Sequence, residues 1–494
     1  MENQANNFIG GKWVPAQSGR TFETRNPATG HVIARCADSG VEDVRQAVAA
    51  AHEAFESWRR LPAPRRGELL YRVAERLGYE KESLARTLTS EMGKVLVEAR
   101  GDVQEAIDMA YYMGGEGRRQ FGHIAPAELP DKSAWSIREP LGVVGLITPW
   151  NFPTAIPAWK SFPALIMGNA VVLKPSPDTP FTAALFMKIL EESGIPPGVV
   201  NLVLGSSPHV GEALVKHPDV ALISFTGSTA TGAKVALDAA THHKRVALEM
   251  GGKNAILVME DADLELAVEG IVWSAFGTSG QRCTACSRLI VHRAVKDRLV
   301  TLLLDRMQRL RVGNGLDPDT DVGPLINRLQ LDRVHEFVKA GQQEGARLLA
   351  GGHPLTEGEY AGGSFFAPTL FDQATPSMRI ANEEIFGPVL TVLEVQSLEE
   401  AIALNNAVEY GLSSALYTQD VNRAQYAMRE LRSGIVYINA GTIGSEVHLP
   451  FGGVKATGNG HREAGQAALD TFSEWKSIYV DYSGRLQRAQ IDTT

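Results

Sequence analysis

Residues 143–174, VVGLITPWNFPTAIPAWKSFPALIMGNAVVLK, decide the fold class of this chain. Two short runs rich in β-branched residues, 143–148 and 170–174, flank an apolar run at 155–165 whose length suits a helix. Two parallel strands need a long crossover connection, and a helix commonly supplies it. The stretch therefore predicts a strand–helix–strand unit of an α/β protein.

The same alternation continues along the chain. It predicts further strands and helices in the order 181–193 (helix), 199–204 (strand), 210–216 (helix), 220–225 (strand), 230–240 (helix) and 245–248 (strand). This series predicts a doubly wound nucleotide-binding domain. A second series predicts another α/β domain, with strands at 254–258, 289–292, 389–395, 413–417 and 434–438. Before residue 120, helices are expected at 41–58 and 65–91.

Composition narrows the class of protein. A chain of 494 residues suggests two or three domains, and its 44% hydrophobic and 21% charged residues are typical of globular proteins. A net charge of −9 without a basic stripe disfavours a nucleic-acid partner. The sequence has no long apolar run and no leader-like start, so we expect neither membrane insertion nor export. The three cysteines make no disulfide framework, so we expect a cytoplasmic protein. No metal-binding motif occurs in the sequence, so we expect no metal site.

Cys283 is the candidate nucleophile. It lies in the polar stretch GQRCTA, residues 280–285, directly after Arg282, whose charge would favour the thiolate. Glu249 supplies a candidate base upstream. The ordinary alternative is a buried, inert thiol, which is the reading we give to Cys286. Nucleophilic catalysis by Cys283 is the leading hypothesis.

Six motifs extend this hypothesis to a family. GQRCTA occurs together with TPWNFP (148–153), FTGSTATG (225–232), LEMGGKN (248–254), EEIFGPVL (383–390) and PFGGVKATGNG (450–460). In this order and spacing the chain resembles the aldehyde dehydrogenase superfamily, from about residue 20 to the C-terminus. The resemblance implies NAD(P)-dependent oxidation of an aldehyde to a carboxylic acid, through a thiohemiacetal and then a thioester on Cys283 that water releases.

The resemblance also implies roles for single residues in catalysis. Glu249 matches the general base, and Asn151, with the Cys283 backbone N–H, matches the oxyanion hole. Lys160 and Glu463 match positions that assist proton movement. Near Glu463 this chain departs from the family pattern, because His461 is an extra residue between Gly460 and Arg462. From the residues alone, Asn151 would be a turn residue before Phe-Pro, and Glu249 a strand-end carboxylate.

No GxGxxG motif marks a cofactor site, and the turn FTGSTATG is the nearest substitute. In the resembled family, a lysine matching Lys174 bonds the adenosine ribose, and Pro177 occupies a position where glutamate often restricts the enzyme to NAD. We therefore expect NAD or NADP to be accepted. Glu384 is assigned to the nicotinamide ribose and Phe386 to packing beside the nicotinamide. The other residues assigned to cofactor binding are Thr148, Trp150, Ser176, Gly227, Ser228 and Gly251.

The substrate tunnel implied by the resemblance is lined by Phe152, Trp159, Arg282, Thr284 and Phe451. Arg282 has two open interpretations: it reads the distal carboxylate of a semialdehyde acid, such as 2-oxoglutarate, aminoadipate or succinate semialdehyde, or it ties down its own loop. Glu446 and His448 are expected near the tunnel mouth. Glu446 would oppose an anionic substrate.

Two segments outside both series are expected to pair into an oligomerisation arm. The tail TFSEWKSIYVDY, residues 471–482, alternates like a strand, and in the resembled family such a tail builds a homodimer or homotetramer with the segment matching 122–140. The expected domains are dinucleotide binding (1–121 and 141–251), catalysis (252–469) and the arm (122–140 and 470–494).

Three alternative functions are kept beside this one. A coenzyme A-acylating dehydrogenase would resolve the thioester without water, and Glu249 argues against it. A non-catalytic binding protein on the same scaffold is disfavoured by the intact set of Asn151, Glu249, Cys283 and Glu384. A cysteine hydrolase would need a histidine partner, which no motif supplies.

Overall fold

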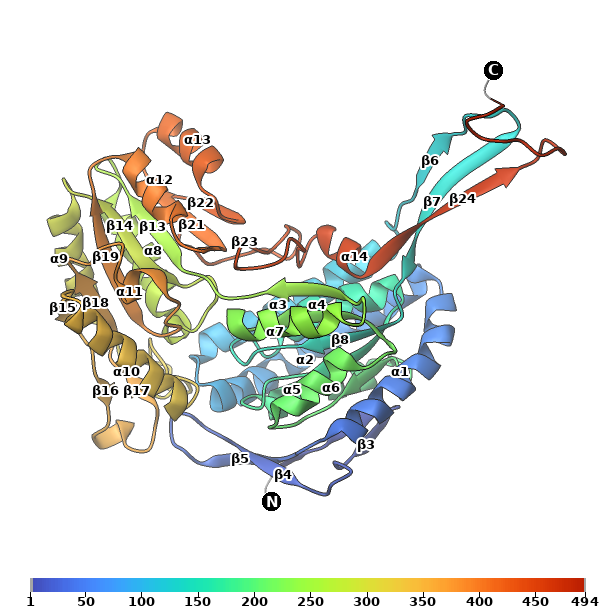
Figure 1. Cartoon of the computed structure of the whole chain (residues 1–494). Helices are drawn as coiled ribbons and strands as arrows, with labels where there is room; N and C mark the ends of the chain where they lie inside the picture. Colours follow the sequence, from blue (N-terminus) through green and yellow to red (C-terminus); the bar gives the residue numbers. More distant parts are fainter. Residues whose placement is uncertain (1–2, 493–494) are drawn as a thin grey trace.

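The computed structural model describes residues 3–492, and two lobes and a projecting arm make up the chain (Figure 1). Each lobe is built on a seven-stranded sheet, and the arm is a separate three-stranded sheet. Two mainly parallel seven-stranded sheets connected by helices confirm the expected α/β fold class.

The sheet of the first lobe has the order β12-β11-β8-β9-β10-β2-β3. Its strands are β2 (Asn7–Ile9), β3 (Lys12–Val14), β8 (Val143–Ile147), β9 (Ala170–Lys174), β10 (Val200–Leu202), β11 (Val220–Thr226) and β12 (Arg245–Glu249). β8 pairs in parallel with β9 on one side and with β11 on the other. The chain therefore winds outward from β8 in both directions, which creates a switch point between β8 and β11 where doubly wound proteins bind ligands.

Helices cover both faces of this sheet. They are α1 (Val41–Arg60), α2 (Ala63–Met92), α3 (Leu96–Glu116), α4 (Ala155–Met167), α5 (Pro180–Glu192), α6 (Pro208–Lys216) and α7 (Thr229–Ala240). The sequence pattern did not predict α3. Its buried side includes Glu98 and Asp102 among the apolar residues, so the apolar stripe that marks most surface helices is interrupted.

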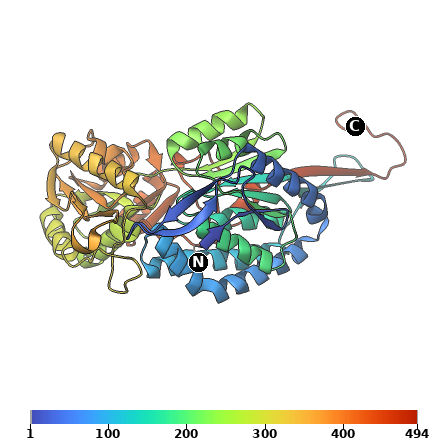
Figure 2. The ribbon, with the colours of Figure 1, turned by 90° about the horizontal axis from the view of Figure 1, so that it is seen from below.

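The N-terminal segment adds strands that were also not predicted. β1 (Asn3–Ala5), β5 (Val32–Ala37) and β4 (Thr21–Arg25) form a small sheet, while β2 and β3 extend the first lobe. The three-residue strands β1, β2 and β3 carry too little periodicity to be recognised, whereas β4 and β5, with five and six residues, were missed without that reason. Seen from below, this segment runs under the first lobe toward the second, where the Ser364 N–H donates to the Pro27 carbonyl at 2.9 Å (Figure 2).

The sheet of the second lobe has the order β15-β18-β19-β14-β13-β21-β22, and only β15 is antiparallel. Its strands are β13 (Asn254–Val258), β14 (Cys286–His292), β15 (Arg347–Ala350), β18 (Thr369–Asp372), β19 (Val389–Val395), β21 (Ser413–Tyr417) and β22 (Ile435–Ile438). Strand β14 begins earlier than the expected residue 289, because Cys286 and Arg288 are buried within the sheet. β15 and β18 were not predicted.

The helices of the second lobe are α8 (Leu264–Phe276), α9 (Lys296–Met307), α10 (Arg328–Gln343), α11 (Arg379–Asn382), α12 (Leu398–Asn406) and α13 (Val421–Glu430). Two small strand pairs complete it, β16 (Pro354–Leu355) with β17 (Phe365–Phe366) and β20 (Tyr410–Gly411) with β23 (Val454–Lys455). The 3₁₀ turns are η1 (Gly277–Gly280) and η2 (Gly358–Tyr360).

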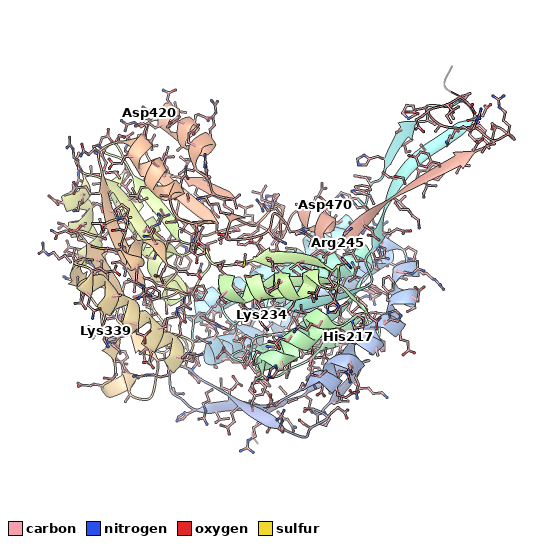
Figure 3. All side chains as sticks on the ribbon, viewed as in Figure 1. His217, Lys234, Arg245, Lys339, Asp420 and Asp470 are labelled. Carbon is pink, nitrogen blue, oxygen red and sulfur yellow. The ribbon has the colours of Figure 1, made fainter. Side chains whose placement is uncertain are left out.

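The arm consists of β6 (His123–Pro126), β7 (Lys132–Pro140) and β24 (Ser473–Asp481), all antiparallel. It projects from the first lobe after the short helix α14 (Ala467–Thr471). Figure 3 shows Arg245 and Asp470 at its root, where Arg245 donates to the Ser473 carbonyl at 2.7 Å. Large apolar side chains remain exposed along it, including Ile124 at 92% and Tyr479 at 66%.

The domain boundaries expected from the sequence stay a prediction, and residues 1–2 and 493–494, which they include, lie outside the described residues. Within residues 3–492, no helix combines the length and the apolar character needed to cross a membrane.

Candidate active site

Three strand ends of the first lobe converge on the second lobe. β8 leads to Asn151, β11 leads to Gly227 and Ser228, and β12 ends at Glu249. Parallel neighbours end at the same edge of a sheet, so these residues gather beside the switch point. Asn151 reaches across the boundary between the lobes, where its Nδ2 donates to the Gln281 carbonyl at 3.1 Å.

The second lobe contributes Cys283 from the loop between α8 and β14. Asn254, at the start of β13, donates from Nδ2 to the carbonyl oxygens of Cys283 (2.7 Å) and Ala285 (3.0 Å). Cys283 lines two cavities, one on each side of it. Cys286 is buried in β14, and its thiol hydrogen bonds the Arg288 carbonyl. The structure therefore exposes Cys283 to both cavities and leaves Cys286 inside the sheet.

The first cavity is called here the cofactor-side cavity. Its walls include eight residues predicted from the sequence: Trp150, Asn151, Gly227, Ser228, Gly251, Cys283, Glu384 and Phe386. The Trp150 and Phe386 rings meet edge to face at 5.3 Å between centroids. A cavity with aromatic walls and a few polar groups suits an organic cofactor.

One of its glycines and one hydroxyl have specific positions. A Cβ on Gly251 would lie 2.3 Å from a Glu384 oxygen, so a larger residue there would displace the Glu384 carboxylate. Glu384 accepts the Gly252 N–H at 3.0 Å, and burial raises the pKa of its carboxyl. Ser228 is the N-cap of α7, because its Oγ accepts the Thr231 N–H. The Ser228 hydroxyl is thus engaged in capping, and the backbone amides at the α7 N-terminus are the better anion donors.

Sequence reasoning missed Gln330 and Arg333, which also line the cofactor-side cavity. Both extend from α10 to the loop 383–387: Gln330 Nε2 donates to the Phe386 carbonyl at 2.8 Å, and the Arg333 guanidinium donates to the Glu384 carbonyl at 3.1 Å. Phe386 has a positive φ of 59°. These contacts stabilise that unusual backbone conformation, and no local motif around residues 330–333 indicated them.

Thr148, Lys174, Ser176 and Pro177 do not line this cavity. The Thr148 N–H donates to the Lys174 carbonyl at 3.2 Å, so these residues continue the same sheet edge away from Cys283. Burial lowers the pKa of Lys174 to about 8. Pro177 lies in a separate hollow with Glu23, Arg25 and Asn327.

The second cavity is called here the substrate-side cavity. All five predicted substrate residues line it: Phe152, Trp159, Arg282, Thr284 and Phe451. Trp159 and Phe451 meet edge to face at 5.3 Å. The sequence did not indicate Ile156, Ile443 or Glu105, which also line it. Burial, with a smaller contribution from Asp102, raises the pKa of Glu105 to about 8.

Arg282 is held by neighbouring protein groups. Its guanidinium donates to Glu98 at 3.1 Å and to the Thr278 hydroxyl at 2.8 Å, and it stacks over the Trp273 ring at 4.9 Å. This geometry favours the second of its two interpretations, the anchoring of the loop. The expectation that Arg282 favours a thiolate is wrong: burial, followed by the charges of Glu249, Glu384 and Glu463, raises the pKa of Cys283 to about 12.

Glu249 lies on the substrate side of Cys283. Burial first, and then the charge of Glu463, raises the pKa of its carboxyl well above the usual range, while Lys160 acts in the opposite direction. Behind it, the buried Lys160 ammonium bonds the Glu463 carboxylate and, at 2.9 Å, the Ser224 hydroxyl. The three residues that the sequence assigned to proton movement are therefore neighbours.

Among residues 3–492, no group of three or more His, Cys, Asp or Glu side chains is arranged to hold a metal ion. The reactive side chains that face or adjoin the two cavities include Cys283, Glu249, Glu384, Glu463, Lys160 and Asn151.

Known proteins resemble the whole chain. The model of the aldehyde dehydrogenase family matches residues 13–478. An alpha-ketoglutaric semialdehyde dehydrogenase of Bacillus subtilis is 42% identical over 480 residues, covering 97% of this chain and 98% of that protein. An alpha-ketoglutarate semialdehyde dehydrogenase of Haloferax volcanii is 41% identical, covering 98% of this chain and 100% of that protein.

Among solved structures, betaine aldehyde dehydrogenase from Staphylococcus aureus in complex with NAD+ superposes with a TM-score of 0.95 at 35% identity, covering 97% of this chain and 96% of that chain. Both the sequence and the fold thus agree over nearly the full length. The chain belongs to the aldehyde dehydrogenase family.

Proposed function

We propose that this enzyme oxidises an aldehyde to its acid at Cys283, with Glu249 as the general base. The carrying observation is that Cys283 forms a wall shared by the two cavities, with Glu249 on the substrate side. Because the pKa of the Cys283 thiol is about 12, little thiolate exists at neutral pH without a base. Glu249 takes the thiol proton as sulfur attacks the carbonyl carbon, and a thiohemiacetal forms.

The oxygen of this adduct needs donors. One N–H of the Asn151 amide bonds the Gln281 carbonyl, and we assign the other, with the Cys283 backbone N–H, to the adduct oxygen. When bound, NAD(P)+ supplies the hydride acceptor. Loss of the hydride leaves a thioester on Cys283. Glu249 first releases to solvent the proton that it took from the thiol. It then takes a proton from water as the water attacks the thioester, and it returns this proton to the departing Cys283 sulfur, so that the acid and the thiol are released.

The cofactor-side cavity fits NAD or NADP. Glu384 offers a carboxylate for ribose hydroxyls, the α7 N-terminus offers amides for the pyrophosphate, and the Trp150 and Phe386 rings line the wall beside Cys283. Lys174, Ser176 and Pro177, further along the same sheet edge, are proposed to face the adenosine half. Support also comes from the similar structure that holds NAD+.

We propose a semialdehyde acid as substrate, with 2-oxoglutarate semialdehyde as the first candidate. Two relatives more than 40% identical to this chain are named for that substrate. The guanidinium of Arg282 is paired with Glu98, so the substrate carboxylate is not assigned to it. A neutral Glu105, favoured at pH 7 by its pKa of about 8, would not repel the carboxylate and can donate a hydrogen bond to it.

We also propose that the enzyme works in the cytoplasm as a homodimer or a dimer-based homotetramer. The described cysteines are all free, as a reducing compartment would keep them. The apolar side chains exposed on the arm provide a surface that a second copy would cover.

Nicotinamide absorbance measured with matched aldehydes tests the reaction and the substrate class. A semialdehyde acid, a neutral aldehyde and an ammonium aldehyde of similar length are compared, with and without coenzyme A. We expect the semialdehyde acid to have the highest kcat/KM and coenzyme A to make no difference. A strict need for coenzyme A would indicate the acylating reaction instead, and absence of nicotinamide reduction with every aldehyde would contradict the proposed function.

A further inference from the structure

We propose that Glu98, on helix α3, is a positioning residue that holds the loop of Cys283 in its working conformation. Glu98 lines neither cavity, and its side chain is 2% exposed. The inference rests on the proposed role of Cys283. It adds a residue that lines neither cavity and touches the substrate-side wall only through Arg282.

The loop before Cys283 has an unusual backbone. Thr278, Ser279 and Gly280 have positive φ angles of 51°, 57° and 68°. Glycine adopts this left-handed region freely, but for threonine and serine it costs free energy, most for the β-branched threonine. Such a conformation persists only where surrounding contacts determine it.

Glu98 supplies those contacts at Thr278. The Thr278 N–H donates to both carboxylate oxygens at 2.9 Å, and the Thr278 hydroxyl donates to Oε2 at 3.0 Å. These bonds satisfy the buried backbone N–H and the buried hydroxyl together. They therefore favour the left-handed conformation over ordinary ones that would move the N–H away from the carboxylate.

The same carboxylate holds the other end of the loop. Arg282, next to Cys283, donates to Glu98 Oε1 at 3.1 Å, and its Nε donates to the Thr278 hydroxyl at 2.8 Å. Glu98, Thr278 and Arg282 thus form a closed ring of hydrogen bonds. The pair of Arg282 and Glu98 is almost fully removed from solvent, so water competes little with its hydrogen bonds. The ring therefore restrains the backbone that precedes Cys283.

Helix α3 fixes the opposite wall of the substrate-side cavity as well. Asp102, one turn after Glu98, accepts the Ala155 N–H at 2.7 Å at the start of α4, and it pairs with the buried Lys94 at 3.0 Å. Helix α4 carries Trp159 and Lys160. One helix therefore sets both the nucleophile loop and the wall facing it, so a small shift at Glu98 is expected to misalign Cys283 with the bound aldehyde.

The test compares Glu98→Gln with Glu91→Gln. Glu91 is a matched control, because it is also buried and accepts the Phe181 N–H, the Thr182 N–H and the Thr182 hydroxyl, yet it does so at the start of α5. Two quantities are measured: kcat with a good aldehyde, and the rate at which iodoacetamide alkylates Cys283 in the ligand-free protein, followed by peptide mass spectrometry.

We expect Glu98→Gln to lower both by about 10- to 100-fold, because Gln accepts fewer hydrogen bonds and carries no charge for Arg282. NAD+ affinity should change less than about threefold. Glu91→Gln should leave the alkylation rate near that of the wild type. Adding Thr278→Gly to Glu98→Gln should restore part of the alkylation rate, because glycine adopts the positive φ without help.

A second pair of variants tests the ring even where Glu98→Gln does not fold. Thr278→Ser keeps the hydroxyl, and Thr278→Val removes it, so only the valine variant should slow alkylation. Equal rates in these two variants, an unchanged rate in Glu98→Gln, or no restoration by glycine would overturn the positioning role. Alkylation does not require turnover, so this failure is distinguishable from failure of the proposed reaction.

Discussion

The Lys160 ammonium group in α4 bonds the Glu463 carboxylate, which comes 303 residues later in the chain, and both groups are close enough to Glu249 to shift its pKa. The backbone fixes the contact, because Glu463 and Phe451 exchange N–H to carbonyl bonds at 2.7 and 2.6 Å. A charged pair with opposite effects on one buried carboxyl provides a means of setting the proton affinity of the base.

The first prediction concerns the pH dependence of kcat/KM. The negative charge of Glu463 raises the pKa of Glu249, so Glu463→Gln should lower that pKa and move the acid limb of the profile to lower pH. The ammonium of Lys160 has the opposite effect, so Lys160→Met should move the limb to higher pH. Each should also cost about tenfold in kcat. Shifts in the same direction would contradict the arrangement.

The second prediction concerns Glu249→Gln. A neutral amide cannot take the proton of the thiol or of the hydrolytic water, so kcat should fall by about 10² to 10⁴, while substrate affinity changes little. Single-turnover experiments should show a thioester that outlives the one in the wild type. The control is Glu446→Gln, because Glu446 is exposed and does not line the substrate-side cavity. Turnover in Glu249→Gln equal to the wild type would remove Glu249 from the mechanism.

The third prediction concerns cofactor choice. Pro177 carries no charge that would repel the 2′-phosphate of NADP, so both cofactors should be used. Pro177→Glu should lower kcat/KM for NADP more than for NAD, because the new carboxylate repels the phosphate and can bond the free 2′-hydroxyl. Measuring kcat/KM with NADP and with NAD, in the wild type and in Pro177→Glu, checks this prediction. An unchanged ratio would place Pro177 away from the adenosine ribose.

The fourth prediction concerns assembly. Ile124 and Tyr479, on opposite edge strands of the arm, are 92% and 66% exposed in the single chain, so a second copy is expected to cover the arm. Light scattering at micromolar concentration should give the mass of a dimer or tetramer. The substitutions Ile124→Lys and Tyr479→Lys together should weaken the oligomer, and Leu237→Lys, on exposed α7, is the control. A monomeric wild type would contradict the proposal.

The sequence predicted the parts of this protein whose pattern is local. Strands β9, β19 and β21 were predicted residue for residue, because buried parallel strands appear as short, mainly apolar runs between helical segments. The residues around Cys283 were found through contiguous motifs. All eight predicted residues in the cofactor-side cavity come from such motifs.

The parts that escaped prediction depend on contacts between distant residues. Glu98 bonds a residue 180 positions away, and Gln330 bonds one 56 positions away. On α3 the acids interrupt the apolar stripe, so both the helix and its role were hidden. The pKa of Cys283 was also misjudged: adjacency in sequence suggested that Arg282 acts on the thiol, whereas in the fold its charge is paired with Glu98.

The central claim is that Cys283 carries the substrate as a thioester, and peptide mass spectrometry of enzyme quenched during turnover tests it most directly. With NAD+ and a good aldehyde, we predict the mass of the acyl group on the peptide containing Cys283, stronger in Glu249→Gln and absent in Cys283→Ser. The variant Cys286→Ser should still carry it, because Cys286 is buried in β14. An acyl group that persists in Cys283→Ser and disappears in Cys286→Ser would contradict the account.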